Sequence, residues 1–175
     1  MSFARRDGTR ERGPLTPQAL DDAALRYLNR FDCSVSKLRR HLRELVRKRG
    51  GDPALGEHIE ALLERYRGSG LLNDERFANN LAGGLKSRGA SRRMVEQKLR
   101  DRGVARDVAQ TAARESPGSD LDAARAYARR RRLGPHRPEA ERAANRRKDL
   151  AALARQGFDY DTATRALGFG ADDDF

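Results

Sequence analysis

Two stretches of the chain align without gaps and share a pattern centred on a glycine: KLRDRGVARDVAQTA (98–112) and ALARQGFDYDTATRA (152–166). Each carries a leucine four residues before the glycine, an apolar residue directly after it and an aspartate four residues beyond it. The pattern predicts a helix, a reversal at the glycine and a second helix whose first turn holds the aspartate, where negative charge suits the helix dipole. Such a repeat indicates a fold assembled from similar units that pack on their neighbours.

Apolar residues recur at helical spacing in the other segments as well. After Thr16-Pro17, a favourable helix start, Leu20, Ala24 and Leu28 share one face of the predicted helix. No stretch alternates between apolar and polar residues with period two, and β-branched residues are few. The sequence therefore predicts an all-α protein of three tandem three-helix repeats in an elongated arrangement.

Clusters of glycine, proline and serine set the predicted boundaries, as in SPGSD at 116–120. Gly83-Gly84 is expected to weaken the second half of the helix that contains it. The predicted parts are a disordered basic N-terminal segment at 1–15, helical repeats at 16–72, 73–117 and 118–169, and an acidic tail at 170–175.

The chain is strongly basic, with a net charge of +11, and arginine supplies 32 of its 37 basic residues. This balance points to polyanionic partners bound through guanidinium groups. A genome rich in arginine codons is an alternative explanation of the Arg:Lys ratio, although not of the net charge. Basic residues outnumber acidic ones nine to two in 26–49, eight to two in 86–106 and ten to two in 125–148.

Because these clusters recur repeat by repeat, we predict a continuous basic strip that meets the partner. The alternative is a solvated surface of salt-bridged helices. The four arginines at 129–132 cover more than one helical turn, so at least one is expected near the inner face, with its aliphatic stem packed there and its guanidinium group in solvent. The predicted strip comprises Arg39, Arg40, Arg43, Arg88, Arg92, Arg93, Arg100, Arg129, Arg130, Arg131, Arg132, Arg146 and Arg147.

The aromatic residues favour packing over base stacking. Tyr27, Phe31, Tyr66, Phe77 and Tyr127 are expected on core stripes, and Phe158 and Phe169 are expected to plug turns. Contact with single- or double-stranded DNA would then run mainly through phosphates, without sequence preference and with steep salt dependence.

No constellation of titratable residues predicts catalysis, and no cofactor or metal is expected. Cys33 is the only cysteine, so no intrachain disulfide forms. His41 flanks an apolar stripe and is expected to be a partly buried structural residue. Because there is no long apolar run and no apolar N-terminal stretch, we expect a cytoplasmic protein without membrane contact.

Four segments resemble the RecX family, the regulators of bacterial RecA recombinase. They are ALRYLNRFDCSVSKLRRHL (24–42), GLLNDERFANNL (70–81), SRGASRRMVEQKLRDRGV (87–104) and RRKDLAALARQGFDYDTATRALGF (146–169). The resemblance covers roughly residues 20–169. It implies a curved, extended chain of three-helix repeats that binds along the groove of the RecA–DNA filament. It also implies suppression of strand exchange, ATP hydrolysis and LexA co-cleavage.

The predicted function is thus a non-enzymatic, monomeric regulator of the RecA nucleoprotein filament in DNA repair. A nonspecific architectural DNA-binding protein that acts without RecA is the alternative. A sequence-specific helix-turn-helix regulator is disfavoured, because the recognition-like helix 92–102 offers one glutamine and no asparagine for reading adenine. The acidic tail is a further candidate, as an internal lid on one of the basic repeats.

Overall fold

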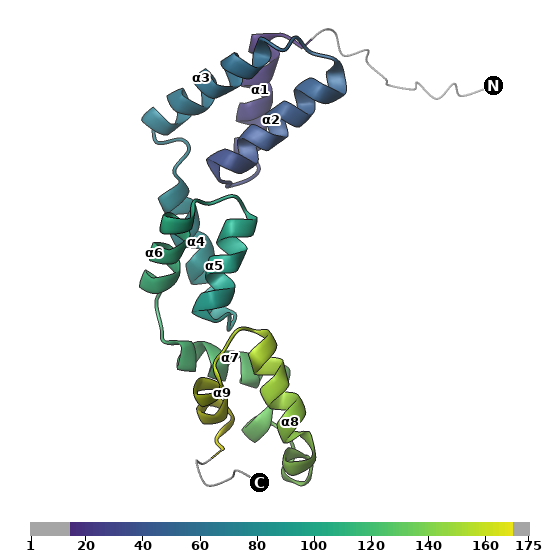
Figure 1. The fold of residues 1–175 in the computed structure, drawn as a ribbon, viewed down its shortest axis with the longest axis vertical. Helices are drawn as coiled ribbons and strands as arrows, with labels where there is room; N and C mark the ends of the chain where they lie inside the picture. Colours follow the sequence, from purple (N-terminus) through teal and green to yellow (C-terminus); the bar gives the residue numbers. More distant parts are fainter. Residues whose placement is uncertain (1–14, 170–175) are drawn as a thin grey trace, which may run out of the picture. The chain divides into compact units, whose positions relative to one another are not determined.

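The computed structural model describes residues 15–169, in which the backbone forms α-helices, one 3-10 helix and no strand (Figure 1). The predicted all-α class and the repeated order of helices are confirmed. Of the expected N-terminal segment only Leu15 is described, and it is buried; the acidic tail lies outside the described residues. The elements are α1 (Pro17–Leu28), α2 (Val35–Arg49), α3 (Leu55–Gly68), α4 (Asp74–Ser87), α5 (Arg92–Asp101), α6 (Arg106–Glu115), α7 (Asp120–Arg131), η1 (Gly134–His136), α8 (Glu139–Arg155) and α9 (Tyr160–Leu167).

The described chain divides into two compact units. The first unit comprises residues 15–32 and Lys37–Leu72, and so contains α1, α3 and most of α2. The second unit comprises the short segment Cys33–Ser36 together with residues 73–169. It contains α4 to α9 and η1.

The first unit has a leucine-rich core at which its three helices meet. Leu20 of α1, Leu38 of α2 and Leu62 of α3 are 0–1% exposed. The N–H of Ala19 donates to the Thr16 hydroxyl, so the predicted cap of α1 is confirmed. Gly50 adopts a φ of +62° directly after α2, which explains why the helix ends there.

In the second unit, α4, α5 and α6 enclose one core cluster. Val95 and Leu99 of α5 pack on small alanines of α6, among them Ala109, whose size lets the two helices approach closely. Asn73 and Ser91 accept main-chain N–H groups as the N-caps of α4 and α5. The glycine pair 83–84 does not interrupt α4, which continues to Ser87.

The helices α7, α8 and α9 enclose the second cluster of this unit. Leu153 and Leu167 are buried within it, and Phe158 fills the turn after Gly157 as predicted. The sequence did not indicate η1, which begins at Gly134. There the buried Asp149 accepts the N–H of Gly134 at 2.8 Å and the Arg137 guanidinium at 2.7 and 2.9 Å, which ties η1 to α8.

An aspartate in the first turn of one helix caps the helix of a preceding repeat. Asp74 accepts the N–H of Val35 at 2.8 Å, and Asp120 accepts the N–H of Arg92 at 3.0 Å. Asp120 also pairs with the buried ammonium group of Lys86. Because the same type of contact occurs twice within the second unit, the sequence repeat has a structural counterpart in how its groups of helices are joined.

Candidate partner-binding surface

The arginines of the predicted strip lie at the surface of their units. Arg39 and Arg146 are half-buried, and the others are exposed. Exposure alone does not make a binding surface, because an arginine that already pairs with a carboxylate of its own chain is less able to bind an anion of a partner. The ion pairs therefore separate these residues into two kinds.

In the first unit, Arg39 and Arg43 are committed to an internal partner. Arg39 lies 3.0 Å from a carboxylate oxygen of Glu60 on α3, and Arg43 lies 2.8 Å from the other. The hydrogen bond from Arg39, with the charge of both arginines, holds the pKa of Glu60 below its ordinary value. These two arginines therefore fit the alternative reading of the basic clusters, a solvated surface of salt-bridged helices. Arg40, between them in sequence, forms no ion pair within the described chain.

In the second unit, α5 and α8 form a groove lined by arginines. It has a volume of about 520 Å³, and Arg93, Arg100 and Arg155 lie along it. Arg100 donates to Gln97 at 2.5 Å and lies 4.0 Å from Glu96, the one carboxylate among the lining residues. Cationic walls with a single acid suit an anionic ligand.

Arg155 is the groove residue that the sequence analysis missed. It lies in the last turn of α8, two residues before Gly157. In the alignment of 98–112 with 152–166, Arg155 lies at the helix end that precedes a repeat glycine. This position in the repeat could have identified Arg155 from the sequence.

The run at 129–132 lies at the C-terminal end of α7, which ends at Arg131, and Arg132 takes a left-handed φ of 53°. All four arginines are exposed. The guanidinium of Arg130 lies 5.6 Å from the ring centre of Tyr127, and the positive charges suit the C-terminal end of the helix.

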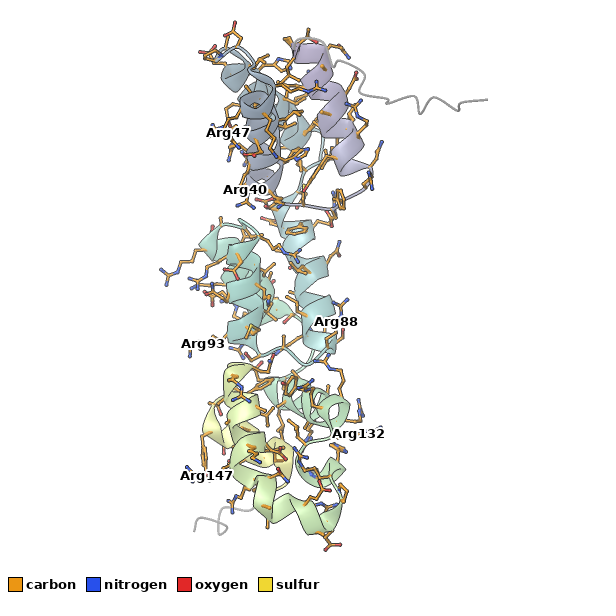
Figure 2. The ribbon with its side chains drawn as sticks, turned by 90° about the vertical axis from the view of Figure 1, so that its right-hand side faces the viewer. Arg40, Arg47, Arg88, Arg93, Arg132 and Arg147 are labelled. Atoms are coloured by element: carbon orange, nitrogen blue, oxygen red, sulfur yellow. The ribbon has the colours of Figure 1, made fainter. Side chains whose placement is uncertain are left out.

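Within the second unit the arginines point in more than one direction. Figure 2 shows Arg93 and Arg147 on one side of this unit and Arg88 and Arg132 on the other. The half-buried Arg146 lies over the ring of Phe169, 4.8 Å from its centre. These four arginines therefore lie on two sides of the unit, of which the first includes an edge of the groove that Arg93 lines.

The aromatic predictions hold for the second unit and fail in part for the first. Tyr66, Phe77 and Tyr127 are buried. Phe31 is 50% exposed, because α1 ends at Leu28 and the stripe does not continue to it. Tyr27 is half-buried and stacks on His41, which is half-buried as predicted.

No group of three or more histidine, cysteine or acidic residues in 15–169 is placed to hold a metal ion. None of the described helices is both long and apolar enough to cross a bilayer.

Comparison with known proteins identifies similar chains. A family model described as the second three-helix domain of RecX matches residues 73–112. The regulatory protein RecX of Myxococcus xanthus is 39% identical over 92% of this chain and 93% of its own. That of Halorhodospira halophila is 35% identical over 90% and 91%. A crystal structure of a regulatory protein RecX has a similar fold, with a TM-score of 0.64 at 20% identity, covering 87% of this chain and 71% of that one.

Proposed function

The chain belongs to the RecX family of regulatory proteins, and from this premise we propose that it binds the RecA–DNA filament and lowers RecA activity. The activities concerned are strand exchange, ATP hydrolysis and LexA co-cleavage. The protein acts without catalysis or cofactor, as a monomer in the cytoplasm. Its partners are RecA and, through phosphate contacts without sequence preference, the single- or double-stranded DNA of the filament.

The observation that carries this proposal is the large number of exposed arginines without an internal carboxylate. Arg40 in the first unit has no ion pair among the described residues. The same is true in the second unit of Arg88, Arg92, Arg93, Arg129, Arg131, Arg132 and Arg147. Guanidinium groups of this kind form bidentate contacts with phosphate or with acidic protein side chains. A filament of protein on DNA offers both classes of anion along its length.

The mechanism proposed is obstruction. A regulator that spans successive RecA subunits in the filament groove occupies the space that an incoming duplex or the LexA repressor needs. By holding neighbouring subunits together, it also restricts the subunit motion that accompanies ATP turnover. Neither effect needs a reacting group on the regulator, and both scale with the fraction of the filament that is covered.

The test is co-sedimentation with single-stranded DNA, either bare or coated with RecA and a nonhydrolysable ATP analogue. Each is measured at about 50 and 200 mM salt, because purely phosphate-driven binding falls by orders of magnitude over that range. We expect preferential binding to the coated DNA that persists at the higher salt. Equal binding to both, disappearing together as the salt rises, would instead identify a charge-driven DNA-binding protein that acts without RecA.

An activity assay completes the test. Added at a stoichiometric amount over the filament, the protein should lower RecA ATPase activity, strand exchange and LexA cleavage together, since one obstruction underlies all three. If it sediments with the filament and leaves all three rates unchanged, it binds RecA without regulating it in this way.

A further inference from the structure

The first unit contains a hollow of about 890 Å³ between α1 and α2. It is lined by three aromatic rings, those of Tyr27, Phe31 and His41, and by the side chains of Arg26, Arg30 and Arg49. All of these residues belong to the first unit, so the hollow does not depend on the placement of any other part of the chain. We infer that this hollow is a stacking pocket for an unpaired base of single-stranded DNA.

The three rings contact one another and form one aromatic cluster, from which the Phe31 ring protrudes. Tyr27 and His41 lie parallel to within 28°, with ring centres 4.2 Å apart. Phe31 tilts against Tyr27 with its ring centre 5.1 Å away. Phe31 is also 50% exposed, although burying its ring would favour folding. Half of a large apolar ring therefore remains available to a planar ligand.

The state of His41 supports this use of its ring. Burial, and then the positive charges of Lys37 and Lys48, lower the pKa of His41 from its ordinary value of 6.5. At neutral pH the imidazole is therefore uncharged, and it packs in the pocket as an aromatic ring.

The charge around the rings has one sign. The three arginines contribute guanidinium groups, and none of the described residues that line the hollow carries a carboxylate. The guanidinium of Arg30 lies 5.6 Å from the centre of the Phe31 ring. Aromatic side chains interleaved with arginine are the usual composition of a surface that stacks bases and neutralises the phosphates beside them.

Single-stranded DNA fits this lining better than a peptide helix does. A groove for an amphipathic helix presents mainly aliphatic side chains, whereas only Ala19, Ala23 and Leu45 supply aliphatic groups here. Duplex DNA keeps its bases stacked within the helix and would offer the arginines phosphates alone. The pocket therefore favours single strands over duplexes, a preference that phosphate contacts by themselves do not create.

This inference goes beyond the proposed regulation of RecA, because it concerns direct contact with a base and needs no RecA. Its experiment contains none. Base stacking without any effect on RecA would support this inference and contradict the proposed function. Regulation of RecA without base stacking would do the reverse.

The chain contains no tryptophan, so Phe31→Trp introduces a single fluorescent reporter on the pocket. We propose to titrate this variant with three probes of equal length: oligothymidylate, an oligonucleotide of abasic sites, and a duplex. The abasic strand keeps the phosphates and removes the bases. We expect quenching by oligothymidylate and little quenching by the abasic strand or the duplex. Equal quenching by oligothymidylate and the abasic strand would overturn the inference.

A second measurement uses the natural sequence with a labelled oligothymidylate and fluorescence anisotropy. Phe31→Ala should weaken binding by about tenfold and leave duplex binding unchanged. Leu25→Ala is the matched control, since Leu25 is a 43% exposed apolar residue of α1, the helix that precedes Phe31, and lies outside the pocket lining. If Phe31→Ala weakens oligothymidylate binding no more than Leu25→Ala does, the pocket does not stack a base and the inference is wrong.

Discussion

The hydroxyl of Ser91 donates a 2.6 Å hydrogen bond to the main-chain carbonyl of Gln156, the C-cap residue directly after α8. Ser34 makes the same type of bond, 2.5 Å long, with the carbonyl of Arg102, the C-cap residue of α5. Both serines are fully buried, and each lies at the start of a helix in the repeat that precedes its acceptor. A buried hydroxyl thus satisfies a helix-end carbonyl that has no partner in its own helix.

Ser91→Ala should lower the free energy of unfolding by about 1–2 kcal/mol, because the Ser91 hydroxyl also accepts the N–H of Met94 as the cap of α5. Ser87→Ala is the control, since its exposed hydroxyl bonds only to the carbonyl of Gly84 in its own helix. That change should cost less than about 0.5 kcal/mol. The measurement is the urea unfolding midpoint of each variant. Equal losses of stability in the two variants would show that the hydrogen bond from Ser91 to the Gln156 carbonyl does not stabilise the fold.

Gly157→Ala should destabilise the second unit far more than Gly168→Ala. Both glycines have positive φ, 83° and 71°, so alanine strains either backbone by about 1–2 kcal/mol. A Cβ at Gly157 would lie 2.7 Å from the hydroxyl of Ser91, whereas one at Gly168 meets no atom of residues 15–169 within 4 Å. We expect the extra overlap to cost about 1–3 kcal/mol more, measured by thermal or urea unfolding. Similar midpoints for both variants would exclude a tight junction at Gly157.

The helix boundaries could be predicted because the signals that set them are local. The hydroxyl of Thr16 begins α1, and the glycine at 50 ends α2, each by satisfying or turning the adjacent backbone. The repeat alignment likewise placed Asp107 and Asp161 in the first turns of α6 and α9. By contrast, η1 depends on the contact of Gly134 with Asp149, fifteen residues away, which no local pattern reveals.

The candidate surface was less predictable, because charge in a sequence does not say which arginine is already paired. Glu60 holds Arg39 and Arg43 from another helix, and neither pairing follows from helical spacing. Phe31 was assigned to the core by continuing a stripe past the end of α1. The stacking of Tyr27 on His41 likewise joins two helices. In each case tertiary packing decides the role.

Asp149→Asn should make the protein less stable at neutral pH and less sensitive to acid. Burial raises the pKa of Asp149, but the hydrogen bonds from Arg137 and Gly134 outweigh it, so the folded-state pKa lies below the ordinary value of 3.8. Its contribution is therefore fully present above the unfolded-state pKa and is lost as the pH falls through the lower folded-state pKa. Weakening the hydrogen bonds of this buried carboxylate should cost about 1–3 kcal/mol at pH 7.

The measurement for Asp149 is the urea midpoint from pH 7 to pH 2. The difference between Asp149→Asn and the unchanged protein should shrink as the pH falls below the ordinary aspartate value. Asp161→Asn provides the comparison, because Asp161 pairs with Arg165 at an exposed position 3.4 Å away. That variant should follow the unchanged protein throughout. A constant difference for Asp149→Asn across the whole pH range would mean that its charge is not what stabilises the fold.

The two basic sides of the second unit can be separated by paired substitutions that change the net charge equally. Arg93→Gln with Arg147→Gln alters the side that includes an edge of the α5–α8 groove, and Arg88→Gln with Arg132→Gln alters the other (Figure 2). We expect the first pair to weaken binding to RecA-coated DNA more, because Arg100 and Arg155 line the same groove as Arg93 and extend its anion-binding surface.

Salt dependence shows whether the arginines on the groove side bind phosphate or protein. Removing one arginine that binds a phosphate should reduce the slope of log affinity against log salt by about 1. The Arg93 and Arg147 pair should therefore lower that slope by about 2 if both bind DNA, and should lower affinity at an unchanged slope if both bind acidic RecA side chains. An equal decrease in affinity for the two pairs would mean that net charge, rather than the groove side, governs binding.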